Sequence, residues 1–173
     1  MAIRPILGFE HPVLREKSKK LSRVDASAQR LIDDLAETML AAPGAGLAAN
    51  QIGVALRVCV VKGDENQIWG LVNPEIVKFE GVQVGYEGCL SYPGWVGEVA
   101  RHETVVVKGK NRHGKDVRIK STGFTARAFQ HEIDHLDGVL FIDRLTSLDT
   151  LRRVEDLTAE KKEEAVAAAS ASG

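Results

Sequence analysis

The sequence lacks the features that membrane proteins, secreted proteins and broad nucleic-acid binders need. No run approaches the roughly 20 apolar residues of a transmembrane helix, and the N-terminal stretch has no long apolar core typical of signal peptides. The two cysteines, Cys59 and Cys89, are too few for a disulfide framework. With 23 Lys and Arg against 24 Asp and Glu, the charge balance argues against a surface that neutralises DNA phosphates. We therefore expect a soluble, cytoplasmic protein that binds neither DNA nor membranes.

The rest of the composition is that of one globular domain. A hydrophobic fraction of 44% is too high for a disordered chain, and 173 residues suffice for one core but hardly for two full domains. The chain ends in an Ala- and Ser-rich stretch, which is typical of a frayed terminus. We expect a single domain over residues 1–162 and a flexible tail over residues 163–173.

Helices are predicted near both ends of the chain. Asp25 can cap a helix over residues 26–40, which carries one apolar stripe. A second helix is predicted over residues 123–136, with its own apolar stripe. A third helix is expected to start near Ser147 or Asp149. The apolar side chains of this third helix that should point inward are Leu148, Leu151, Val154 and Leu157.

Strands are predicted between the first and second helices. There, β-branched runs alternate with short turns rich in Gly, Asn and Pro, as in antiparallel sheets. The strand-like segments are 56–61, 67–72, 75–80, 97–107 and 115–120. The order of helix, strands, helix, helix predicts an α+β domain with helices packed on a mostly antiparallel sheet.

The strongest chemical signal is the segment His131-Glu132-Ile133-Asp134-His135 in the predicted helix 123–136. Residues four apart lie on the same face of a helix, so both histidines can bind one metal ion. Glu132 lies beside them and can reach a water molecule on that ion without being a ligand. The metal would acidify the water and the carboxylate would take its proton.

Two imidazoles do not make a tight metal site, so a third ligand is needed. Glu155 or Glu160 would supply it in the arrangement of gluzincin proteases, whereas Phe141 stands where metzincin proteases carry a histidine. Cys89 is the other candidate, because a thiolate is a strong ligand for zinc or ferrous iron. Cys59 lies in an apolar run and is expected to be a small buried side chain.

A third segment, Gly44-Ala45-Gly46-Leu47-Ala48-Ala49-Asn50-Gln51, is small, uncharged and glycine-bearing. Glycines permit a ligand to approach the backbone closely, and a glutamine side chain can donate a hydrogen bond to a developing oxyanion. Tight packing is the more frequent reason for such a stretch, so on its own it does not define a function.

Together and in this order, the three segments resemble the motifs of the peptide deformylase family: G-x-G-x-A-A-x-Q, E-G-C-x-S and Q-H-E-x-x-H. The chain carries them at residues 44–51, 87–91 and 130–135, and the resemblance covers most of residues 3–145. It implies an α+β fold with mostly antiparallel sheets around a central helix that carries the H-E-x-x-H motif, plus an N-terminal and a C-terminal helix. It also implies an enzyme that removes the formyl group from the N-terminal formyl-methionine of newly synthesised polypeptides and releases formate.

The resemblance also implies roles for residues at the metal. Cys89, His131 and His135 would hold one divalent ion, usually Fe²⁺, with Zn²⁺, Ni²⁺ or Co²⁺ able to occupy the same site. A metal-bound water would attack the formyl carbon. Glu132 would accept the proton of that water and later deliver it to the leaving amine.

Further residues would bind the substrate by the same resemblance. The side-chain amide of Gln51 and the backbone N–H of Leu90 would stabilise the oxyanion. Gly46 would hydrogen-bond the peptide backbone in the manner of strand addition. An apolar slot for the methionine side chain would be lined by Ala45, Phe124, Ala128 and the ring edge of His131.

Three charged residues have open roles at this stage. Arg127 stands where many relatives have an aliphatic residue, which leaves the shape of the methionine slot undetermined. Glu87 and Arg101 either pair and brace the Cys89 segment or remain separate in solvent.

Two alternative functions share the H-E-x-x-H motif. A zinc endopeptidase would use a histidine or glutamate as its third ligand, and a metal-braced binding domain would need a fourth protein ligand. The charges of residues 150–164 nearly cancel, so counterion release would support at most a weak or transient ribosome contact.

Overall fold

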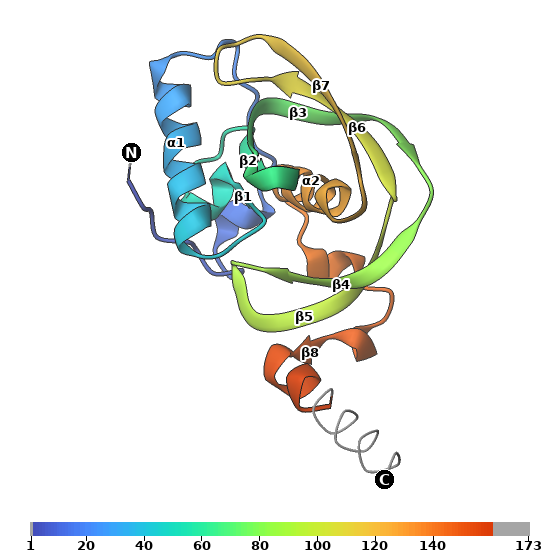
Figure 1. Ribbon diagram of the computed structural model, residues 1–173. Coiled ribbons are helices and arrows are strands. Elements are labelled where there is room, and N and C mark those ends of the chain that lie inside the picture. The colour runs from blue at the N-terminus through green and yellow to red at the C-terminus, as the bar shows by residue number, and fades with distance from the viewer. Residues whose placement is uncertain (1, 161–173) are drawn as a thin grey trace.

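Two antiparallel sheets surround one helix in the computed structural model, which describes residues 2–160 (Figure 1). The larger sheet has five strands in the order β1-β2-β3-β6-β7, and the smaller has three in the order β4-β5-β8. The strands of the larger sheet are β1 (Gly46–Ala48), β2 (Val58–Lys62), β3 (Ile68–Glu80), β6 (Thr104–Lys110) and β7 (Asp116–Thr122). Those of the smaller sheet are β4 (Gln83–Cys89), β5 (Tyr92–Arg101) and β8 (Arg152–Arg153).

Helix α1 (Ala26–Ala41) covers one side of the larger sheet. It begins where predicted, because the carboxylate of Asp25 accepts hydrogen bonds from the backbone N–H groups of Ser27 and Ala28, both at 3.0 Å. Its buried face packs Ile32 and Leu35 against strand β2. Burial of this apolar stripe, rather than intrinsic propensity, holds the helix in place.

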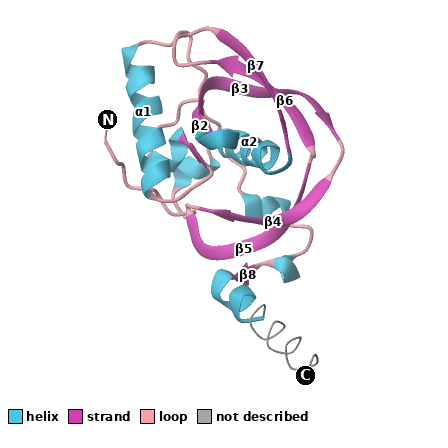
Figure 2. Ribbon diagram, viewed as in Figure 1, coloured by secondary structure: helices cyan, strands magenta, loops and turns pink. Residues whose placement is uncertain are grey.

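Helix α2 (Gly123–Leu136) lies in the middle of the fold, with the strands of both sheets wrapped around it (Figure 2). It has the predicted bounds, and it carries the H-E-x-x-H segment. Gly138 follows its end with a φ of +76°, a left-handed conformation that glycine adopts without strain. The helix is buried nearly all round, which places polar side chains inside the domain where they must find partners.

Strand β2 separates the two halves of the core. Cys59 and Val61 face the cluster that includes Phe129 of α2, whereas Val58 and Val60 face the cluster under α1. A strand covered on both faces shows no alternation of polar and apolar residues, as in the run Val58-Cys59-Val60-Val61. Cys59 is fully buried, in agreement with its predicted packing role.

Several predicted boundaries are wrong. Segments 67–72 and 75–80 form the single strand β3, interrupted by an irregularity at Asn73, where φ is +53°, and at Pro74. Segment 97–107 instead contains two strands, β5 and β6, because the chain turns at residues 102–103. These differences leave the predicted class intact, and the α+β expectation is confirmed.

The third helix begins later than expected. Residues 148–150 form a short 3-10 turn, β8 follows, and residues 154–160 are helical. Leu148 is 79% exposed and Val154 is 43% exposed, so their predicted inward orientation is wrong. Pairing of β8 with the edge of β5 directs the chain outward here. The predicted tail, residues 163–173, lies outside the described residues. None of the helices within residues 2–160 has the length and apolar character of a membrane span.

Candidate active site

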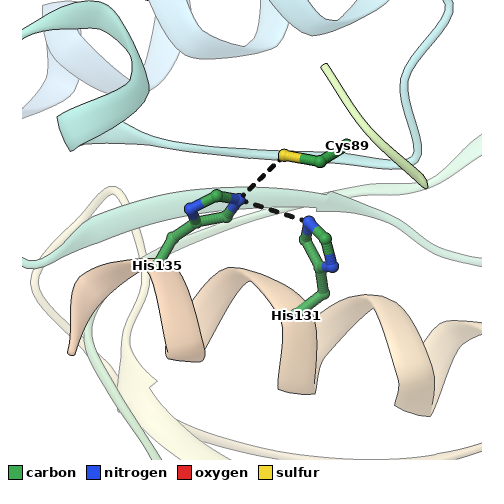
Figure 3. Close-up of side chains that lie close together, drawn as sticks. All are labelled: Cys89, His131 and His135. Carbon is green, nitrogen blue, oxygen red and sulfur yellow. Dashed lines mark hydrogen bonds between the residues drawn. The ribbon is translucent and has the colours of Figure 1, made fainter. Parts of the chain in front are cut away.

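Three metal-ligand atoms from two distant segments meet beside helix α2 (Figure 3). His131 and His135 lie on successive turns of the helix, with their Nε2 atoms 3.2 Å apart. Cys89 approaches from the end of strand β4 and places its Sγ atom 3.2 Å from Nε2 of His135. All three ligand atoms lie within 4.8 Å of one another. Helical spacing places the two histidines side by side, and the fold brings Cys89 to them.

The backbone around these ligands is firmly held. Cys89 sits at a register irregularity between β4 and β5, where it pairs with Tyr92. At the end of α2, the side-chain amide of Asn50 donates a 2.6 Å hydrogen bond to the backbone carbonyl of His135. The N–H of Ser18 donates to the carbonyl of Leu136 at 2.9 Å. Distant segments thus add hydrogen bonds to the carbonyls at the end of the helix.

Glu87 orients the imidazole of His131. Its carboxylate accepts a 2.9 Å hydrogen bond from Nδ1 of His131, which leaves Nε2 facing Cys89 and His135. The same carboxylate accepts hydrogen bonds from Arg101 at 2.7 and 3.0 Å and from Arg127 at 2.9 Å. Burial alone would raise the pKa of Glu87, but the hydrogen bonds from Arg101 and His131 hold that pKa well below its ordinary value. The Glu87–Arg101 pair is therefore a buried brace and not a solvated surface pair.

Arg127 adds a second buried guanidinium to this brace. Besides Glu87, it donates to the backbone carbonyl of Val99 at 3.0 Å and, at the longer distance of 3.4 Å, to that of Gly85. Arg127 thereby ties α2 to strands β4 and β5.

Glu132 lies between the two histidines in sequence and is 3% exposed. Its Oε2 atom has no hydrogen-bond partner among residues 2–160. Burial raises the pKa of Glu132 to about 7, partly offset by the nearby His131. A carboxyl group that is buried, unpaired and near neutral in pKa is suited to accepting and returning a proton at physiological pH.

Gln51 is oriented toward Cys89 by the local backbone. Its side-chain oxygen accepts a hydrogen bond from the N–H of Ala48 at 2.9 Å. Its side-chain nitrogen therefore points the other way, donating to the hydroxyl of Ser91 at 3.1 Å and reaching Sγ of Cys89 at 3.6 Å. Leu90 lies between Cys89 and Ser91 in the same turn. Gln51 and Leu90 line the same cavity as Cys89.

The residues present fit a divalent cation. A thiolate and two imidazoles suit zinc, ferrous iron and similar ions, and three protein ligands leave a fourth position open for catalysis. Burial and the neighbouring His131 lower the pKa of His135, which keeps that imidazole neutral as a ligand must be. The pKa of His131 is instead raised, against the effect of burial, by hydrogen bonds to Cys89 and Glu87, so a bound ion would displace a proton from this imidazole.

The other proposed third ligands do not reach this site. Glu155 is exposed, and its carboxylate pairs with Arg153 at 3.1 Å. Glu160 is also exposed and pairs with Arg152 at 2.8 Å. Neither belongs to the group of metal-ligand atoms found in the described residues, whereas Cys89 does.

A cavity of about 450 Å³ opens onto the ligand cluster. It is lined by every residue predicted for substrate binding from the sequence: Ala45, Gly46, Phe124, Ala128 and His131. Arg127 lines it as well. The sequence reasoning missed several further lining residues, among them Tyr86, Tyr92, Trp95 and Val154. Tyr92 directly follows Ser91, so its aromatic ring was a readable signal, but Val154 gave none because it is far away in sequence.

This arrangement defines a class of protein. An α+β domain that buries an H-E-x-x-H helix and brings a distant cysteine to its two histidines is a metal-binding hydrolase. The particular family follows from comparison with known proteins: the family model described as Polypeptide deformylase matches residues 3–151. The chain belongs to the polypeptide deformylase family, and the resemblance drawn from its three motifs is confirmed.

Relatives and solved structures agree with this assignment. A peptide deformylase of Dehalococcoides mccartyi is 54% identical over 155 residues, which cover 89% of this chain and 93% of the relative. The crystal structure of a peptide deformylase from Legionella pneumophila superposes with a TM-score of 0.81 at 42% identity, covering 98% of both chains. That of the Thermotoga maritima enzyme gives a TM-score of 0.81 at 38% identity, covering 85% of this chain and all of the other.

Proposed function

We propose that this protein removes the formyl group from the N-terminal formyl-methionine of newly synthesised polypeptides and releases formate. The observation that carries the proposal is the meeting of Cys89 with His131 and His135, beside the unpaired carboxylate of Glu132. The cavity at this cluster supports it further, because an apolar slot next to the reacting group is what a methionine side chain requires.

Cys89, His131 and His135 would hold one divalent ion, for which we propose Fe²⁺. Zn²⁺, Ni²⁺ and Co²⁺ prefer the same donor atoms and could occupy the site as well. When bound, such an ion would lower the pKa of a coordinated water from 15.7 to about 7 and so supply a nucleophile at neutral pH. Glu87 supports the ion indirectly by holding the ring of His131 in the tautomer that presents Nε2.

Glu132 would move the proton of the reaction. Its Oε2 atom is buried and free of hydrogen bonds within the described chain, so it can accept a proton from the attacking water. The same atom can then deliver that proton to the nitrogen of the leaving amine. Because burial brings the pKa of Glu132 to about 7, neither transfer is strongly uphill at neutral pH.

Gln51 and Leu90 would stabilise the oxyanion that forms at the formyl oxygen. The side-chain nitrogen of Gln51 faces the cluster because its oxygen is occupied by the N–H of Ala48. A donor that is fixed before the reaction costs no reorganisation when the negative charge develops. The backbone N–H of Leu90 would act as the second donor.

The substrate would lie across the cavity. Its methionine side chain would contact Ala45, Phe124 and Ala128 and the ring edge of His131, all of which line the cavity. Gly46 would hydrogen-bond the peptide backbone. The carbon of a formyl group bears only a hydrogen, so it can reach a nucleophile in a site too narrow for larger acyl groups.

We propose a cytoplasmic location, since formylated chains are made there, and at most a transient contact with the ribosome. Arg152 pairs with Glu160, and Arg153 pairs with Glu155. Little positive charge of these arginines is therefore left to bind RNA phosphates. Apart from Asp156, the other charged residues of this segment lie outside the described residues.

Formate release from formyl-Met-Ala by protein loaded anaerobically with Fe²⁺ is the direct test. Zinc-loaded protein and the Glu132→Ala variant should be measured beside it, and acetyl-Met-Ala serves as the matched substrate with a larger acyl group. We expect formate from the formyl peptide, no acetate from the acetyl peptide, and a loss of at least 100-fold in Glu132→Ala. Cleavage of internal peptide bonds without formate release would support a zinc endopeptidase instead.

A further inference from the structure

Asp134 stands at an open position of the H-E-x-x-H segment and takes no part in the proposed reaction. Its carboxylate is nonetheless only 12% exposed, on the helix that carries both histidine ligands. Oδ2 of Asp134 accepts a 2.6 Å hydrogen bond from Nη1 of Arg101. Arg144 donates two more, from Nε to Oδ2 at 2.9 Å and from Nη2 to Oδ1 at 2.8 Å. This buried carboxylate thus joins two guanidinium groups.

These contacts extend the brace around Glu87 into a chain of charged side chains that ends on a metal ligand. Arg101 donates to Asp134 through Nη1 and to Glu87 through Nε and Nη2. Glu87 in turn accepts the 2.9 Å hydrogen bond from Nδ1 of His131. From Arg144 inward, positive and negative groups alternate, and each step includes a hydrogen bond of 2.6 to 2.9 Å.

Arg144 enters this chain from a surface position whose backbone is held firmly. It ends the 3-10 helix Phe141–Arg144, which follows α2 after a short turn. Phe141 is buried, and Leu145 forms a β-bridge with Val99, so the backbone is anchored on both sides of Arg144. The side chain of Arg144 is itself 48% exposed. A half-exposed guanidinium therefore reaches a buried carboxylate.

The outer end of the chain lies outside the proposed substrate site. A second cavity, of about 290 Å³, is lined by Arg101, Asp134 and Arg144 among others. It shares no lining residue with the cavity that opens onto Cys89 and His131. A substitution at Arg144 therefore changes no side chain that lines the proposed substrate site.

Asp134 keeps its direction because of Arg144. A bidentate guanidinium–carboxylate pair restricts the carboxylate in both position and direction. Without Arg144, the carboxylate would keep only the hydrogen bond from Arg101 among these contacts, and it could turn about its side-chain bonds. Arg101 would then lack a fixed acceptor on one side, so its two hydrogen bonds to Glu87 would be held less firmly. Because Glu87 orients the ring of His131, the disturbance would end at a metal ligand.

We propose that Asp134 and Arg144 are positioning residues for the metal ligand His131, acting through Arg101 and Glu87. The inference rests on the proposed function, because it requires a divalent ion at the three ligands. Groups that orient a ligating histidine typically change metal affinity by about 10- to 100-fold. Three side chains separate Arg144 from the imidazole, so its effect should lie at the lower end of that range.

The affinity and spectrum of bound Co²⁺ test this assignment. Arg144→Gln should raise the dissociation constant of Co²⁺, measured anaerobically by competition with a chelator, about tenfold. The visible absorption bands of bound Co²⁺ should shift, because they report the arrangement of the ligands and not the stability of the fold. Asp134→Asn should shift them in the same way. At saturating Co²⁺, Arg144→Gln should lower kcat for formyl-Met-Ala and leave KM unchanged, since the substrate site is untouched.

Arg15→Gln is the matched control. Arg15 also pairs through two nitrogens with a carboxylate, that of Asp143, the residue next to Arg144. Its side chain is 47% exposed, almost as much as that of Arg144, but its partner has no contact with the charged chain. Affinity and spectrum should therefore stay as in the wild type. In a Glu87→Gln background, Arg144→Gln should change the affinity less than twofold, because the chain is already interrupted.

The outcomes separate this inference from the proposed function. Wild-type affinity and spectrum in Arg144→Gln, in protein that releases formate, would overturn the positioning role and leave the proposed function standing. Equal changes in Arg15→Gln and Arg144→Gln would also overturn it, since surface charge in general would then explain both. A loss of affinity that Glu87→Gln suppresses, in protein that releases no formate, would support the positioning role and overturn the proposed function. Failure of the wild-type protein to bind Co²⁺ would overturn both.

Discussion

Gly46 lies against the carboxyl group of Glu132, so closely that a β-carbon at position 46 would come within 2.7 Å of Glu132 Cγ and 2.8 Å of its Cδ. The lack of a side chain at position 46 thus sets where the carboxylate can sit. Real β-carbons do not approach other atoms this closely, and Glu132 is buried with little room to move.

Gly46→Ala should therefore displace Glu132 and lower kcat. General acid–base catalysis is worth about 10² to 10⁴ in rate, and we expect a loss within that range. Metal content, measured by elemental analysis, should not change because the three ligands are untouched. Gly8→Ala is the matched control, since its β-carbon would also meet a glutamate carboxylate, that of the exposed Glu10. Equal activity of Gly46→Ala and wild type would contradict this view of Glu132.

Replacing Gln51 with leucine should reduce kcat by about 10² to 10³, the usual effect of removing one oxyanion donor. Leucine is close in size to glutamine, so the loss would reflect the missing amide. Ser91→Ala removes a partner of Gln51 but leaves the amide in place, and its kcat should fall by less than about tenfold. Comparable losses in both variants would show that the amide has no special role.

Substitution of the two cysteines should have different effects on metal content and activity. Cys89→Ala removes one of three ligand atoms, so we expect the purified protein to lose stoichiometric metal and activity. Cys59→Ala should keep both, with reduced thermal stability because Cys59 is fully buried in the core. A Cys89→Ala protein that still binds metal tightly would support a different third ligand.

Glu87→Gln should destabilise the fold. The substitution leaves the buried guanidinium of Arg127 without a charged partner and leaves Arg101 paired with Asp134 alone, so we expect a loss of about 3 kcal/mol in the free energy of unfolding at pH 7. Urea unfolding of metal-free protein would measure it.

The destabilisation caused by Glu87→Gln should depend on pH. The folded-state pKa of Glu87 lies below its ordinary value of 4.5, so its stabilising effect is present above about pH 4.5. That effect is lost as the pH falls through the folded-state pKa, because the unfolded chain then binds the proton more readily. The difference between wild type and Glu87→Gln should therefore shrink below pH 4.5. Asp116→Asn is the control, since Asp116 pairs with Lys110 on an exposed surface and should hardly matter at any pH.

Much of the fold was readable from local sequence. The bounds of helix α2 follow from its apolar stripe and from Gly138, and α1 follows from the Asp25 cap. What local sequence could not supply was pairing between distant strands. The short strand β8 forms only because β5 offers an edge, so the start of the last helix was placed too early.

The candidate site, like the fold, could be predicted from local sequence only in part. Helical spacing alone predicted His131 and His135 as partners, but only the fold and the family motifs brought Cys89 to them. The sequence left open whether Glu87 and Arg101 pair or remain in solvent, and it gave no sign that Arg127 joins them, because the three residues lie on three different elements. Site residues were thus predictable from local sequence where they follow one helix, whereas those contributed by other segments needed the family motifs or the fold.

The amide of Asn50 has a consequence for heat inactivation. It connects the turn that carries Gln51 directly to the carbonyl of His135, and it is fully buried. This hydrogen bond thus couples Gln51, which would stabilise the oxyanion, to helix α2, which would supply two of the metal ligands. Warming that loosens this link should misalign the two before the ligands themselves separate. Catalytic turnover should then disappear at a lower temperature than the bound ion.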